Sequence, residues 1–162
     1  MAGSPDTGRG VQLSVIERLI DRDPSVREEA PLTRAQSLRI HREAVRRDLE
    51  WLLNSHRSIV PVPEAYRELE RSLFAYGLPD INSIRLESQA DQQRLVRAIQ
   101  SAIELFEPRL TRVRVTPLTP LKKSVLTIRF QIEAQLRADP VPEQISFDTV
   151  LEVARGSYEV KS

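Results

Sequence analysis

The spacing of hydrophobic residues changes near residue 108, from a helical period to a strand period. Before that point apolar residues recur every three or four positions, and after it they recur at every second position. The sequence therefore predicts helices first and strands afterwards. That order is typical of an α+β domain, with N-terminal helices packed on one face of a C-terminal antiparallel sheet of three to four strands.

Four segments carry the helical pattern. The first is the stretch QLSVIERLID, whose apolar residues have helical spacing and which ends before Pro24. The second runs from about Thr33, a predicted N-cap, to Ser55. Its apolar stripe consists of Leu38, Val45, Leu49, Leu52 and Leu53.

The third and fourth helical segments flank a turn, GLPDIN. Tyr66, Leu69 and Leu73 predict a short helix that stops at Gly77. The fourth segment is the most regular one, with Ser88 as its N-cap and Pro108 as its terminator. Its apolar stripe consists of Leu95, Ile99, Ala102, Ile103 and Phe106.

Strand patterns follow Pro108 in quick succession. In LTRVRVT the side chains of Thr111, Val113 and Val115 alternate with two arginines. The segments SVLTIRFQIEAQLR and ISFDTVLEV alternate in the same way, and Arg155-Gly156 predicts a hairpin into a last strand at Tyr158. These patterns predict consecutive strands joined in order.

The composition is that of a single globular domain. We expect a disordered tail at residues 1–10 and one domain over residues 11–162. The chain has no cysteine and no apolar run long enough to cross a membrane, and its first residues lack a secretory signal. We therefore expect a cytoplasmic protein without membrane insertion. The net charge of +1 gives no indication of nucleic-acid binding.

The residues offer little catalytic chemistry. Glu104, Glu107 and Asp80 are the conceivable acids for a hydrolase, but Glu104 lies off the apolar stripe and Asp80 belongs to a turn. His41 and His56 are too far apart in sequence for a zinc pair on one helix, and both are most simply interpreted as solvated. We expect no catalytic residues, no metal site and no cofactor.

The corner Glu107-Pro108-Arg109 places an acid and a base on either side of a proline. The simplest interpretation is a helix terminator flanked by a local surface ion pair, worth under about 1 kcal/mol. A docking point for a partner is the alternative. Residue chemistry alone leaves both interpretations open.

Several motifs resemble the TssE family in order and spacing. They are RRDLEWLLNSHR, SLFAYGLPDINSI, FEPRL followed by an alternating strand, and ISFDTVLEVARGSYEV. TssE proteins are baseplate wedge subunits of bacterial type VI secretion systems, related to the sheath-initiating baseplate protein of contractile phages in a family often labelled lysozyme-like. The resemblance covers about residue 13 to the C-terminus, and Ser55-His56 departs from it.

The resemblance implies a structural role at the baseplate, on the inner face of the bacterial inner membrane. It implies that Glu107, Pro108 and Arg109 dock on the wedge partners TssF and TssG, so that Arg109→Ala weakens this association and leaves the fold intact. It also implies that the sheet templates the first ring of the sheath proteins TssB and TssC through added strands. The regions to expect for this are the strand from Ser124 to Arg137 and the hairpin near Tyr158.

Two other functions stay open within the same family. One is a peptidoglycan-degrading, lysozyme-like enzyme, although no acid pair in the sequence supports it. The other is a regulatory binding module of the anti-adaptor type. The intact Glu-Pro-Arg corner and the complete set of C-terminal strands favour the baseplate subunit.

Overall fold

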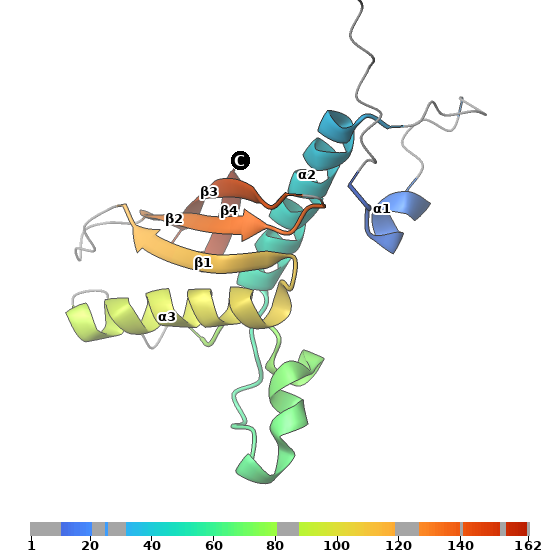
Figure 1. Cartoon of the computed structure of the whole chain (residues 1–162). Helices are drawn as coiled ribbons and strands as arrows, with labels where there is room; N and C mark the ends of the chain where they lie inside the picture. The colour runs from blue at the N-terminus through green and yellow to red at the C-terminus, as the bar shows by residue number, and fades with distance from the viewer. Residues whose placement is uncertain are drawn as a thin grey trace, which may run out of the picture.

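The computed structural model describes residues 11–20, 25, 32–80, 88–118, 127–139, 141–152 and 155–161. Helical elements come first and a four-stranded antiparallel sheet follows, which confirms the α+β prediction (Figure 1). The expected tail at residues 1–10 lies outside the described residues. The helical elements are α1 (Val15–Leu19), α2 (Arg34–Asn54), the 3-10 helices η1 (Glu64–Arg71) and η2 (Leu73–Ala75), and α3 (Gln89–Phe106).

The caps of the two long helices are those that the sequence predicts. Thr33 accepts a hydrogen bond from the backbone of Gln36, and the Gln36 side chain accepts one from the backbone of Thr33, which together form a capping box. Ser88 accepts a hydrogen bond from the backbone of Asp91 at the start of α3. No helix in the described part of the chain is long and apolar enough to cross a membrane.

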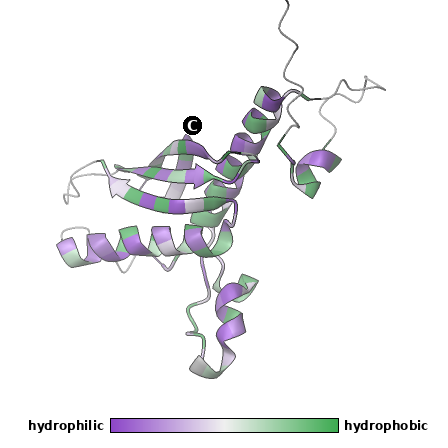
Figure 2. Ribbon diagram, in the orientation of Figure 1, coloured by the Kyte–Doolittle hydropathy of each residue, from purple (hydrophilic) through white to green (hydrophobic). Residues whose placement is uncertain are grey.

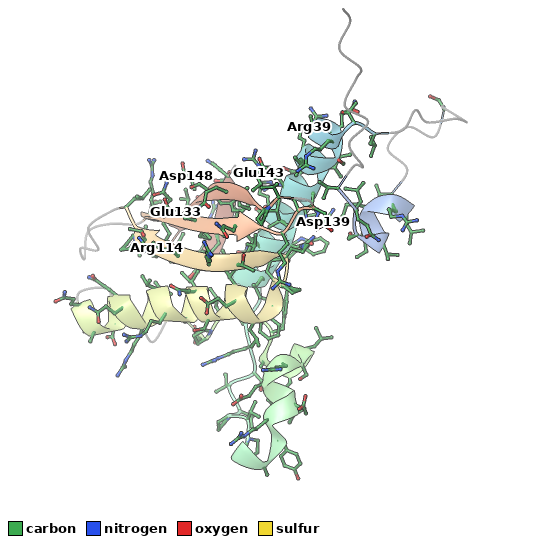
Figure 3. All side chains as sticks on the ribbon, in the orientation of Figure 1. Arg39, Arg114, Glu133, Asp139, Glu143 and Asp148 are labelled. Carbon is green, nitrogen blue, oxygen red and sulfur yellow. The ribbon has the colours of Figure 1, made fainter. Side chains whose placement is uncertain are left out.

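The sheet is a meander in the order β1 (Leu110–Pro117), β2 (Thr127–Leu136), β3 (Glu143–Glu152) and β4 (Ser157–Lys161). Hydropathy alternates along the strands, as period-two patterns require (Figure 2). One face forms the core with the helices. The opposite face is polar and carries Arg114, Glu133 and Asp148 (Figure 3).

The two long helices cover the same inner face of the sheet, each near a different edge strand. Helix α3 packs beside β1 and α2 packs beside β4, with a smaller contact between the two helices. Their apolar stripes meet the inward side chains of β2 and β3 in one core. The largest fully buried side chains of this core include Leu49, Leu95, Ile103, Phe130, Ile132 and Phe147.

A β-bulge interrupts the alternation of β1. The register with β2 shifts between Thr111 and Arg114, and Arg112 has a φ of 53°. Consequently Leu110, Val113 and Val115 face the core, whereas Thr111 is only half-buried. The prediction that Thr111 shares a face with the valines is wrong because the extra residue of the bulge resets the phase of the strand.

Residues 55–78 form a projection whose base, at Leu78, belongs to the core (Figure 1). The base is closed by hydrogen bonds from Leu78 N to Ser55 O (2.8 Å) and from Arg57 N to Leu78 O (3.0 Å). The predicted short helix is present as η1 and η2, but its apolar side chains do not reach the core, and Leu73 is 87% exposed. The third apolar pattern therefore marks a surface feature.

Candidate functional site

The corner at residues 107–109 turns the chain from α3 into β1. Glu107 caps α3 and donates its backbone N–H to Ile103 O at 2.9 Å. The Glu107 carbonyl then accepts from Leu110 N at 3.0 Å, which closes a tight turn around Pro108. Because proline has no N–H and disfavours a helical conformation in the residue before it, this sequence ends the helix here.

The two charged side chains of the corner bind each other. Arg109 Nε donates to Glu107 Oε1 at 2.6 Å, and Arg109 Nη2 donates to Glu107 Oε2. The exposed fractions of the side chains are 6% for Glu107 and 22% for Arg109. The pair is thus forked and mostly buried, whereas residue chemistry alone suggested a solvated pair.

A carboxylate from α2 joins the pair from 61 positions away. Asp48 Oδ2 accepts from Arg109 Nη2 at 2.6 Å, so Arg109 lies between two acids. Burial lowers the pKa of the Arg109 guanidinium, but hydrogen bonds and charges from Glu107 and Asp48 raise it above its usual value. The corner is thereby tied to the middle of α2.

The network continues from Asp48 to α1. Arg47 donates to Asp48 Oδ1 through Nε and Nη2, both at 3.2 Å, and Arg47 Nη2 also reaches Glu17 Oε1 at 2.9 Å. Glu17 is almost fully buried, although α1 exposes its apolar side chains. Five charged residues, Glu17, Arg47, Asp48, Arg109 and Glu107, thus link α1, α2 and the corner.

His41 lies on α2 within reach of this network and is buried, so the interpretation of His41 as solvated is wrong. Burial lowers the pKa of its imidazole, and the positive charge of Arg109 lowers it further. Glu107, Glu17 and the backbone of Arg137 act in the opposite direction. His41 Nδ1 has no hydrogen-bond partner among the described residues. His56 is exposed, as expected.

Only part of the corner is exposed to solvent. Pro108 is exposed, and Leu105, one turn earlier on α3, is 42% exposed. The polar heads of Glu107 and Arg109 are turned toward α2 instead. The acid and the base of the corner are thus internal supports, and the proline is its accessible residue.

The three conceivable catalytic acids have different surroundings. Glu104 is exposed and accepts a hydrogen bond from Gln100 at 3.0 Å, and Asp80 is exposed near the base of the projection. Both oxygens of Glu107 are engaged by Arg109. Among the described residues, no group of three histidines or acids is arranged to hold a metal ion.

Three members of the site were not predicted from the sequence. Asp48 and Arg47 look like ordinary charged positions of an amphipathic helix, and Glu17 lies in a segment whose apolar residues suggested the opposite orientation. The only available signal was position, because Asp48 lies directly beside the buried Leu49. A charge at the margin of an apolar stripe can reach a buried partner.

A family model described as baseplate wedge protein gp25 matches residues 39–141, more than half of the chain. The matched region includes Asp48 and the corner at residues 107–109, and excludes α1 and β4. No curated protein and no solved structure has a significant match to the chain.

Proposed function

The chain belongs to the family of baseplate wedge protein gp25, which is also the family of TssE, and from this we propose a structural subunit of a type VI secretion baseplate. In this proposal the subunit docks on TssF and TssG through the corner Glu107-Pro108-Arg109. It acts in the cytoplasm, at the inner face of the bacterial inner membrane, and it starts assembly of the TssB and TssC sheath. It performs no catalysis.

One observation carries the docking proposal: Pro108 is exposed, and the residues on either side of it hold it in place. Pro108 stands at the apex of a turn whose two flanking side chains are fixed to each other and to Asp48. A surface that is rigid before binding loses little conformational entropy when a partner covers it. The corner therefore suits a lasting contact in an assembled machine.

The sheet has edge strands to which a sheath strand could be added, but the long strand expected from the sequence is not one of them. Every residue of β2 (Thr127–Leu136) pairs with β3, and β2 also pairs with β1, so this part of the expected region is not a free edge. Residues 124–126 of that region lie outside the described residues. Strands β1 and β4 are the edges. Of the two expected regions, only the hairpin near Tyr158 contains an edge strand.

The docking proposal is tested by changing the exposed residue while keeping its supports. Pro108→Arg adds a long side chain at the apex, and we expect it to abolish co-purification with TssF and TssG from cells that express all three proteins. Gln93→Arg, at an exposed position near the start of α3, is the matched control. Unchanged recovery of Pro108→Arg, with a folded protein by circular dichroism, would refute docking at this corner.

A further inference from the structure

The outer edge of β4 is occupied by side chains of α2. Asn54 Nδ2 donates to Tyr158 O at 2.8 Å, and Tyr158 N donates to Asn54 Oδ1 at 2.8 Å. About two helical turns earlier, Arg46 Nη1 donates to Val160 O at 2.9 Å. Tyr158 and Val160 therefore direct these backbone groups away from β3, into the positions where a fifth strand would pair.

The Asn54 side chain imitates a residue of that missing strand. A side-chain amide has the same donor and acceptor as a peptide group, and here it makes both hydrogen bonds that one residue of an antiparallel neighbour exchanges with Tyr158. Three backbone groups of the β4 edge are thus already satisfied. An edge covered in this way resists uncontrolled pairing with other chains.

We propose that Asn54 and Arg46 form a latch on β4, and that an extended segment of the sheath displaces the latch when the sheath begins to assemble. This inference rests on the proposed function, because it takes the sheath as the source of the strand. Tyr158 and Val160 stay anchored by side chains buried in the core, so β4 keeps its position while its partners change.

The exchange conserves hydrogen bonds on both sides. The incoming backbone replaces the Asn54 amide at Tyr158. Asn54 is the last residue of α2, where its side chain is exposed, and its Nδ2 also donates to Glu50 O at 2.7 Å, a bond that the exchange leaves in place. Arg46 retains Glu43 and Glu50, whose carboxylates it contacts at 2.8 and 2.9 Å. Opening the latch therefore leaves no buried polar group without a partner.

The test removes the latch and measures two quantities on the full chain. Asn54→Ala takes away both bonds to Tyr158 and also the bond from Asn54 Nδ2 to Glu50 O within α2. We expect amide hydrogen exchange at Tyr158, followed by NMR, to be at least about tenfold faster. We expect the dissociation constant for the purified TssB–TssC complex to fall about fivefold, because the free protein no longer has a competitor to displace. Arg46→Gln is expected to tighten binding in the same direction.

Ser55→Ala is the matched control. It removes a bond of the same kind, from Ser55 Oγ to Trp51 O at 2.8 Å, from the same helix end without touching β4. Equal or weaker sheath binding by Asn54→Ala relative to Ser55→Ala, or unchanged exchange at Tyr158, overturns the latch.

If Asn54→Ala instead forms dimers by light scattering without tighter sheath binding, the occupant is a second copy and the sheath proposal for this edge is overturned. Failure of the wild type to bind TssB–TssC at all refutes sheath initiation itself, which is a separate outcome.

Discussion

Arg109 and Glu107 face each other across Pro108 as a forked ion pair, with Nε on Oε1 at 2.6 Å and Nη2 on Oε2. Because Arg109 also binds Asp48 on α2, the pair connects the end of α3 to the middle of another helix. The corner is therefore part of what holds the helices together. That role argues against the expectation that Arg109→Ala leaves the fold intact.

Arg109→Ala is expected to lower the free energy of unfolding by about 3 kcal/mol, because it leaves the buried carboxylate of Glu107 without its cation. Arg109→Lys retains the charge but loses the planar fork, so its loss should be smaller. Urea denaturation measures both. The control is Arg97→Ala, at an exposed position of α3. Equal stability of Arg109→Ala and Arg97→Ala would show that the pair contributes nothing to the fold.

Glu17→Ala is expected to release α1 from α2, because Glu17 is the buried side chain of α1 and Arg47 is its ion-pair partner. Arg18, the next residue, is exposed and becomes an accessible trypsin site once the helix opens. Cleavage after Arg18 should accelerate by about an order of magnitude. Ile16→Ala, at an exposed position of the same helix, should leave the cleavage rate unchanged, and equal rates for the two variants would contradict the anchoring role.

Acidification is expected to destabilise the fold through His41. Its pKa is lowered in the folded protein, first by burial and then by Arg109, so the unfolded chain binds the proton more readily. The stability that neutral His41 contributes is fully present above the ordinary histidine pKa of about 6.5. It is lost as the pH falls through the lower pKa of the folded protein. His41→Gln should flatten the stability profile below about pH 6.5 relative to wild type, as measured by urea denaturation. His56→Gln, at an exposed histidine, is the control, and a profile equal to that of His41→Gln would contradict the assignment.

The periods of the apolar residues predicted the long helices and the sheet because those elements obtain their stability from one shared core. The stripes of α2 and α3 are buried as predicted except for Leu38 and Phe106, which are half-buried, and the apolar positions of β2 are buried throughout its described length. Helix caps at Thr33 and Ser88 were equally predictable, since they depend on residues three positions apart.

The pattern failed where apolar residues do not enter the core. In α1 the apolar positions have helical spacing, yet the buried side chain is Glu17 and Leu19 is 78% exposed. At η1 and η2 the same pattern lies on a projection. Periodicity records which residues share a face, but it does not record what that face contacts. The ion-pair network was also beyond prediction, because Asp48 and Arg109 meet only through the tertiary fold.

Gly77→Ala is expected to open the base of the projection. Gly77 has a φ of 105°, and a Cβ atom added there would lie 2.3 Å from Ser55 O, the atom that accepts the hydrogen bond from Leu78 N. The backbone conformation alone costs a non-glycine residue about 1–3 kcal/mol, and the clash with a backbone carbonyl adds to it. We therefore expect a lower melting temperature together with faster amide exchange at Leu78 and Arg57.

Gly156→Ala gives the comparison for that prediction. Gly156 lies in the turn before β4 with a φ of 62°, a left-handed conformation that alanine adopts at a cost of about 1–2 kcal/mol. A larger loss for Gly77→Ala than for Gly156→Ala isolates the contribution of the close approach to Ser55. Equal losses would mean that the base of the projection yields to the added methyl group, and that residues 55–78 are not held rigidly to the core at this point.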